Sequence, residues 1–219
     1  MKDIAKFIAG FERFQEKYFT HDRELFDQLR HEQRPRVMVI SCCDSRVDPA
    51  ILTGAEPGEM FVVRNVANLV SPYKPGGNFA SVPAALEFAV QSLEVEHVIV
   101  LGHAQCGGIR ALMSDAGPGG EFIGKWVSIA QRARERVLAE LPQKSPALQA
   151  RACEQAAILI SLENLMTYPW IARRVAAGSL HLHGWYFDIE EGSLLCYAPV
   201  SNAFEPINAG SSEQPWSKG

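Results

Sequence analysis

The sequence lacks the long apolar runs of membrane proteins. None of its 219 residues lies in an uninterrupted apolar stretch of 18 or more, the length typical of a membrane-spanning helix. The first residues, 1–6, enter an amphipathic pattern with acidic side chains, without the continuous apolar region and small-residue cleavage site of a signal peptide. We therefore expect no membrane span and a cytoplasmic protein.

An excess of basic charge is also absent. The 21 Lys and Arg residues are outnumbered by 25 Asp and Glu residues, for a formal net charge of −4. Proteins that bind nucleic acids normally carry a basic patch or stripe. The one basic group, Arg132, Arg134 and Arg136, is interleaved with Glu135 and Glu140, as on a solvated helix face. We expect no nucleic-acid partner.

A disulfide framework is the third absence. Five cysteines, an odd number, are spread over a long chain, which is typical of metal ligands and buried thiols in a reducing compartment. With 47% hydrophobic and 21% charged residues, the composition is that of an ordinary globular protein. We predict one domain, with a helical arm at 1–34, a core at 35–205 and a tail at 206–219 that is frayed or lies over another subunit.

Short, continuous apolar runs at 37–40, 60–63 and 98–101 are typical of strands buried on both faces of a mainly parallel sheet. Residues 81–93 between them predict a helix, with Ser81 as its N-cap. Further helices are expected at 121–140 and 146–167, and a terminal pair of strands at 180–188 and 194–198. The order predicts an α/β fold in which helices flank a central sheet.

The N-terminal region carries an apolar stripe at helical spacing. It consists of Ile4, Phe7, Ile8, Phe11, Phe14 and Tyr18. A second short helix is expected at 23–30. The stripe is too aromatic to remain in water, so it packs either on its own domain or across a neighbouring subunit.

Two segments hold the residues most suited to chemistry, Ser41-Cys42-Cys43-Asp44-Ser45-Arg46 and Gly102-His103-Ala104-Gln105-Cys106-Gly107-Gly108. Each follows an expected strand, and ligands of open α/β sheets bind beyond the carboxyl ends of strands. Together they offer two thiols and an imidazole. Catalytic zinc sites use three protein ligands and keep a position open, whereas structural sites use four.

Local geometry suggests which side chains face this site. If the chain stays extended beyond Ile40, Cys42, Asp44 and Arg46 share one side, and Cys43 is a small buried residue on the other. His103 and Cys106 share a face if a helix begins at Ala104, which would place Cys106 near a helix N-terminus that favours its thiolate.

Asp44 has two possible roles. Its carboxylate could close the metal site as a fourth ligand, or it could accept a hydrogen bond from a water on the metal. Arg46 favours the second role, because a guanidinium binds a carboxylate with two parallel hydrogen bonds and draws it away from the metal. A purely structural ion pair is the alternative.

The patterns C-x-D-S-R and H-x-x-C-G-G resemble the signature of the β-class carbonic anhydrases. The resemblance extends through Glu59–Asn68 and His183-Gly184-Trp185 and covers roughly residues 36–199. It implies one Zn²⁺ per chain, held by Cys42, His103 and Cys106, and reversible hydration of CO2 to bicarbonate and a proton by zinc-bound hydroxide. Asp44 and Arg46 would then be the catalytic pair.

Resemblance to the plant-type branch of this family implies the substrate pocket. Its residues would be Gln33, Phe61, Val66, Phe88 and Gly107. Gln33 and Phe88 would come from a neighbouring subunit, which implies a homodimer or a tetramer of paired dimers. Another branch has a non-catalytic bicarbonate site of Trp, Arg and Tyr; the matching positions here are Val39, Arg64 and Phe187, so only the arginine is retained.

Two alternatives remain open from the sequence. A hydrolase for carbonyl sulfide or carbon disulfide would use the same zinc site, and a non-catalytic zinc protein or thiol redox sensor would use Cys42, Cys43 and Cys106. Retention of Asp44 and Arg46 argues against the second. His97, His181 and His183 are interpreted as strand-end or surface residues rather than ligands.

Overall fold

The computed structural model describes residues 2–21, 23–76, 80–117, 119–207 and 216. They divide into two compact units, Met1–Arg34 and Pro35–Gly219.

The first unit is helical and rich in aromatic contacts. It contains α1 (Lys2–Gln15), a π-helical turn (Glu16–His21) and α2 (Glu24–Leu29). The rings of Phe14 and Tyr18 lie 4.9 Å apart, and both contact Phe26 of α2. The other members of the stripe, Ile4, Phe7, Ile8 and Phe11, are more than half exposed. Only the C-terminal part of the predicted stripe is therefore packed within this unit.

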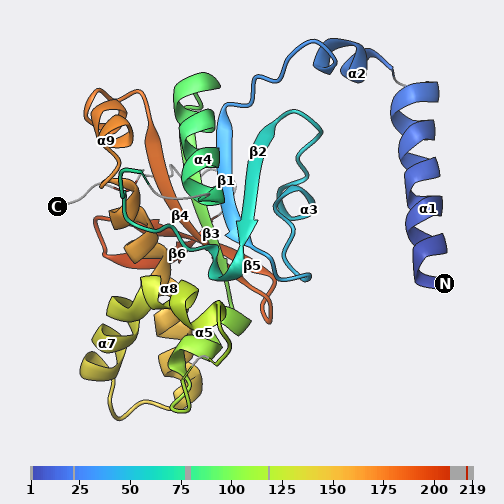
Figure 1. The fold of residues 1–219 in the computed structure, drawn as a ribbon. Coiled ribbons are helices and arrows are strands. Elements are labelled where there is room, and N and C mark those ends of the chain that lie inside the picture. Colours follow the sequence, from blue (N-terminus) through green and yellow to red (C-terminus); the bar gives the residue numbers. More distant parts are fainter. Residues whose placement is uncertain (1, 22, 77–79, 118, 208–215, 217–219) are drawn as a thin grey trace. The chain divides into compact units, whose positions relative to one another are not determined.

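A six-stranded sheet forms the centre of the second unit (Figure 1). Its strands are β1 (Val37–Cys42), β2 (Met60–Asn65), β3 (His97–His103), β4 (His181–Asp188), β5 (Ser193–Ala198) and β6 (Ala203–Pro206). They lie in the order β2-β1-β3-β4-β5-β6; the first four are parallel to one another, and the β4–β5 and β5–β6 pairs are antiparallel. The predicted α/β fold with a mainly parallel sheet is confirmed, while β6 was not predicted.

The helices of the second unit are α3 (Pro49–Thr53), α4 (Ser81–Glu87), α5 (Gly107–Met113), α6 (Ile123–Val127), α7 (Gln131–Glu140), α8 (Pro146–Leu165) and α9 (Pro169–Ala176). Two details of the helix predictions were wrong, and two helices, α3 and α9, were not predicted. Ser81 is the first helical residue of α4 and Ala80 is the cap, without a side-chain hydrogen bond. The helix expected at 121–140 is divided by a 3-10 turn, Ser128–Ala130, and α3 was missed because five residues carry too little periodicity.

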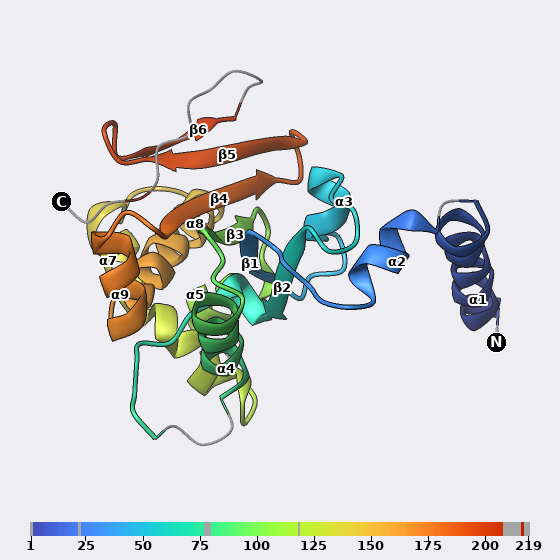
Figure 2. The ribbon, with the colours of Figure 1, turned by 90° about the horizontal axis from the view of Figure 1, so that it is seen from above.

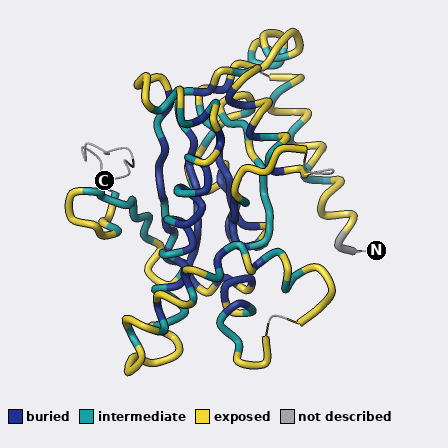
Figure 3. Tube along the Cα trace, turned by 60° about the vertical axis from the view of Figure 1, so that its left-hand side comes forward, coloured by how far each residue is buried: buried dark blue, intermediate teal, exposed yellow. Residues whose placement is uncertain are grey.

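Side-chain alternation divides the core between the two faces of the sheet. Met38 and Ile40 of β1 face the layer of α4, α8 and α9, which Figure 2 shows on one side of the parallel strands. Val39 faces the other side, where Leu52 of α3 packs. Figure 3 shows the strands as the most continuously buried part of the trace.

Little of the predicted tail falls within the described residues. Residues 208–215 and 217–219 lie outside them. Trp216 is buried in the main core, and its backbone N–H donates to the carbonyl of Leu182 at 2.7 Å.

Two glycines allow the sheet and α8 to approach closely. A Cβ on Gly102 of β3 would lie 2.7 Å from Cδ1 and 2.9 Å from Cγ1 of Ile158. A Cβ on Gly184 of β4 would lie 3.0 Å from Cγ2 of the same residue. Ile158 is fully buried, so it has little room to move away.

We therefore predict that Gly102→Ala lowers the free energy of unfolding by about 1–3 kcal/mol, the usual cost of overpacking. Ile158→Val removes Cδ1, the nearest atom, and by itself should cost about 0.5–1.5 kcal/mol. The double variant should lose less free energy of unfolding than the sum of the two single losses, as measured by urea unfolding. Strict additivity would show that this contact is not what requires glycine.

Candidate metal centre

Cys42 is the last residue of β1 and is 5% exposed. Beyond it the chain turns, because the N–H of Val47 donates to the carbonyl of Asp44 at 3.1 Å. The predicted extension to Arg46 was therefore wrong. Cys43 is exposed rather than buried, so the prediction of a small buried residue at this position was also wrong.

His103 and Cys106 are brought together by a turn rather than by a helix. His103 ends β3, and α5 begins only at Gly107, with Cys106 at its N-cap position. Between them Gln105 has a φ of 57°, a left-handed conformation that reverses the chain. The expectation of a helix from Ala104 onward was wrong, although Cys106 does precede a helix as expected.

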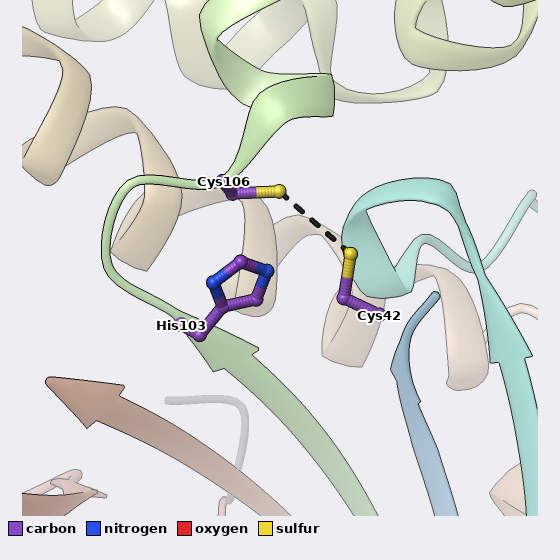
Figure 4. A group of neighbouring side chains, drawn as sticks. All are labelled: Cys42, His103 and Cys106. Atoms are coloured by element: carbon purple, nitrogen blue, oxygen red, sulfur yellow. Dashed lines mark hydrogen bonds between the residues drawn. The ribbon is translucent and has the colours of Figure 1, made fainter. Parts of the chain in front are cut away.

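Cys42, His103 and Cys106 form a buried Cys–His–Cys group (Figure 4). Their ligand atoms all lie within 4.8 Å of one another, and the two Sγ atoms are 4.0 Å apart. Figure 4 shows the thiols from two separate segments pointing toward each other, with the imidazole beside them. Among the described residues, no other group of three His, Cys, Asp or Glu ligands is this close.

The tautomer of His103 leaves a nitrogen available to a metal. Nδ1 lies 2.8 Å from the carbonyl oxygen of Ala104, which can only accept, so Nδ1 carries the proton. Nε2 is buried, and it has no hydrogen-bond partner among the described residues. A buried, orphaned acceptor is costly unless a ligand satisfies it. The donor set therefore fits a metal that prefers sulfur and nitrogen, as zinc does.

The two thiols of the group titrate together. The hydrogen bond from Cys106 lowers the pKa of Cys42, and the same bond raises the pKa of Cys106. Burial opposes protonation of His103, but contact with Cys42 and the Ala104 carbonyl outweighs burial and raises its pKa. These shifts favour a Cys42 thiolate beside a protonated imidazole, so a metal ion that bound here would displace the proton from Nε2 of His103.

Arg46 binds Asp44 at the edge of this group. Nε and Nη2 of Arg46 lie 2.9 and 2.8 Å from Oδ1 and Oδ2, and the Arg46 N–H donates to Oδ1 at 3.0 Å. The side-chain hydrogen bond from Arg46 is the main reason that the pKa of Asp44 falls far below its usual range. Asp44 Oδ2 is 3.9 Å from His103 Nε2, beside the Cys–His–Cys group without being part of it.

A buried carboxylate beneath Cys106 was missed by the sequence analysis. Glu154 of α8 accepts the N–H of Cys106 at 3.0 Å through Oε1 and the hydroxyl of Tyr186 at 2.7 Å through Oε2. Burial raises the pKa of Glu154, against the effect of these two donors. Its position in the sequence could have indicated a buried carboxylate, because Glu154 falls on the apolar face of α8, four residues before Ile158.

Val66 and the glycines of the second motif lie near the group. A Cβ on Gly108 would lie 2.7 Å from Val66 Cγ1 and 3.0 Å from Ala67 Cβ, so close packing requires this glycine. A Cβ on Gly107 would meet nothing within 4 Å, which shows that Gly107 borders open space. The indole N–H of Trp126 donates to the Val66 carbonyl at 2.7 Å and fixes this wall.

The remaining expected pocket residues lie elsewhere in the chain. Phe61 and Phe88 contact each other, with ring centroids 5.8 Å apart. Phe61 stands four positions before Asn65, the partner of Cys42 in the sheet, which is about 13 Å along the strand. Gln33 belongs to the first unit, whereas the Cys–His–Cys group belongs to the second.

Three of the other five histidines gather toward the opposite end of the strands. His97 begins β3 and His181 begins β4. His97 Nδ1 lies 3.0 Å from His183 Nε2, and the His97 ring also packs near that of His181. The structure does not bring any of them to the Cys–His–Cys group.

Comparison with known proteins identifies the family. The family model described as carbonic anhydrase matches residues 37–194. β-Carbonic anhydrase 5, a chloroplastic protein of Arabidopsis thaliana, is 44% identical over 177 residues. That match covers 80% of this chain but only 58% of the Arabidopsis protein.

Solved structures agree with this match. The β-carbonic anhydrase CcaA is 35% identical with a TM-score of 0.87, covering 96% of this chain and 94% of that one. One of two tetrameric β-carbonic anhydrases of Sordaria macrospora is 30% identical with a TM-score of 0.74, covering 89% and 93%. Within the part of the chain that the structure describes, no helix is long and apolar enough to cross a membrane. The predicted relationship is confirmed: the chain belongs to the carbonic anhydrase family, in its β class.

Proposed function

We propose that this chain catalyses the reversible hydration of carbon dioxide to bicarbonate and a proton, with one zinc ion held by Cys42, His103 and Cys106. The observation that carries the proposal is a buried group of two thiols and an imidazole beside a carboxylate that Arg46 holds out of that group. Zinc bound by three protein ligands lowers the pKa of a water molecule and so supplies a nucleophile at moderate pH.

Asp44 and Arg46 act on the reacting oxygen through hydrogen bonds. Because its pKa is held low, Asp44 remains a carboxylate and can only accept. Each carboxylate oxygen keeps capacity beyond its bond to Arg46, so Asp44 can accept from a water or from the hydroxyl of bicarbonate. The pair therefore orients an O–H group and supplies a positive charge close to the product anion.

The pocket is proposed to be completed by a second subunit. Val66 and Gly107 border the group within one chain, where an apolar surface suits CO2, a molecule without a net dipole. Because Phe61 and Phe88 contact each other, both would reach a neighbouring subunit's site together, along with Gln33. We propose a homodimer or a tetramer, as the Sordaria macrospora enzymes are described as tetrameric.

All five cysteines are free thiols, which suits a reducing compartment, and we propose the cytoplasm. A hydrolase acting on carbonyl sulfide or carbon disulfide would use the same residues. Values of kcat/KM measured for the three gases on one preparation distinguish it from a carbonic anhydrase.

The first test concerns the metal ligands. In Cys106→Ser, one of two thiolates is lost, so we expect the zinc content to fall well below one per chain and CO2 hydration to be lost. Elemental analysis and stopped-flow hydration measure both. Cys43→Ser is the matched control, because Cys43 is exposed and outside the group. Full zinc content and full activity in Cys106→Ser would refute the assignment. If the protein were instead a redox sensor that uses Cys43, the control variant Cys43→Ser would also differ from the unmodified protein.

The second test concerns Glu154. In Glu154→Gln, the amide group cannot accept from both Cys106 and Tyr186, so one buried donor loses its partner, at about 1–3 kcal/mol. We expect a lower Tm and zinc retention weakened about 10- to 100-fold in chelator competition. Glu163→Gln, on the same helix, removes only an ion pair with Arg132 at the surface and should leave both unchanged. Equal effects in the two variants would exclude support of the metal centre by Glu154.

The third test concerns assembly. Phe7→Ser with Phe11→Ser removes exposed apolar area from α1. We expect weaker association in sedimentation velocity. The rate of CO2 hydration should fall as the fraction of monomer rises. Glu12→Gln on the same helix is the control. A monomeric variant with undiminished kcat/KM would show that the second subunit contributes nothing to the pocket.

A further inference from the structure

We propose that Arg64 is a positioning residue, which fixes the Cys42–Asp48 turn and thereby the orientation of the Asp44 carboxylate. The inference rests on the proposed function, since it assumes that Cys42 is a metal ligand and that Asp44 contacts the reacting oxygen. It assigns Arg64 a role through the backbone of this turn rather than through contact with substrate.

Arg64 lies on β2 directly opposite Ser41 of β1. From there its guanidinium group reaches across the beginning, middle and end of the turn. Nε donates to the carbonyl of Cys42 at 2.9 Å, Nη2 donates to the carbonyls of Asp44 and Val47, both at 2.8 Å, and Nη1 lies 2.9 Å from Asp48 Oδ2. One planar group thus holds four points of a seven-residue segment.

Asp48 extends this restraint to the next helix. Its other oxygen, Oδ1, accepts the N–H groups of Ala50 and Ile51 at 3.1 and 3.3 Å and so caps α3. Because one carboxylate oxygen binds Arg64 and the other binds the helix, the end of the turn cannot shift without breaking both.

The turn needs such an anchor because it lies beyond the strand. The carbonyls of Asp44 and Val47 have no strand beside them, and each would lose a strong hydrogen bond if Arg64 were removed. Asp44 has a short side chain, so the position of its carboxylate follows that of its backbone. A displacement of about 1 Å at a catalytic group can cost about 100-fold in rate.

Donor counting also argues against a separate role for Arg64 in binding an anion. An arginine side chain has five N–H donors, and four of them donate to described residues of the turn. Bidentate binding of bicarbonate would require breaking some of these bonds. The companion positions, Val39 and Phe187, pack as apolar side chains against the sheet. Arg64 therefore retains a structural task where that anion site is missing.

The test compares full-length Arg64→Lys and Arg64→Gln with the unmodified protein. Arg132→Lys, at an exposed arginine that pairs with Glu163, is the control for loss of a guanidinium group. Lysine presents a single centre in place of a planar fork, so it can replace only some of the bonds. We expect kcat/KM for CO2 to fall about 10- to 100-fold in Arg64→Lys and further in Arg64→Gln, with no change in Arg132→Lys.

Three readouts separate positioning from a general loss of stability. The visible spectrum of the cobalt-substituted protein and the pH midpoint of kcat/KM should both shift. Amide exchange at residues 43–48 should accelerate relative to the rest of the sheet. A lower Tm with an unchanged spectrum, pH midpoint and local exchange would overturn the proposal. Inhibition by added bicarbonate that disappears in Arg64→Gln, with the spectrum unchanged, would instead identify an anion site.

Two further measurements keep the outcomes distinct. If Arg64→Gln does not fold, Asp48→Asn is the substitute, because an amide whose one oxygen caps α3 has no acceptor left for Nη1 of Arg64. It should shift the same readouts in the same direction, to a smaller extent. If the unmodified protein binds no zinc or does not hydrate CO2, the proposed function fails. Amide exchange in the metal-free Arg64→Lys protein then still tests the inference, because slow exchange at residues 43–48 would refute it.

Discussion

The parallel register between β1 and β3 is the constraint on which the rest of the site depends. Ser41 lies opposite Leu101, so Cys42 and His103 end two adjacent, hydrogen-bonded strands although 61 positions separate them in the sequence. A slip of one residue in β1 would turn Cys42 to the other face of the sheet and replace it with Ser41. The geometry of the Cys–His–Cys group is thus a consequence of strand pairing, before any metal is bound.

The two turns that follow these strands are stabilised in the same way. Beyond the end of a strand, backbone groups lose their partners in the sheet, and charged side chains from neighbouring elements replace them. Arg64 of β2 binds the carbonyls after β1, and Glu154 of α8 binds the N–H of Cys106 after β3. Arg46 joins the two turns, since its Nη2 also donates to the Gln105 carbonyl at 3.1 Å. Side chains of β2 and α8 therefore position both turns, and Arg46 links them.

The sequence was sufficient for strands β1 to β5 and for the metal-ligand candidates, because both depend on local signals. Apolar runs located β1, β2 and β3, and motifs at their ends located Cys42, His103 and Cys106. The path of the chain between those residues could not be predicted. The turn after Cys42 depends on Arg64, a side chain from another strand. The reversal at Gln105 uses a left-handed conformation, which a glutamine in the sequence does not predict. The role of Glu154 was not predicted for the same reason, because its partners Cys106 and Tyr186 are distant in the sequence.

The placement of both ligand segments at strand ends bears on how such a protein can change in evolution. Strand register sets the distance between Cys42 and His103, so that distance does not depend on the lengths of the connections among the 60 residues between them. For a flexible loop, each doubling of length costs only about 0.6 kcal/mol in closure entropy. Insertions and deletions are thus tolerable in the connections that lie away from the site, yet a single one inside β1, β3 or the two turns that follow them would disrupt the site. Lineages can diverge widely in chain length while they keep the same three ligands.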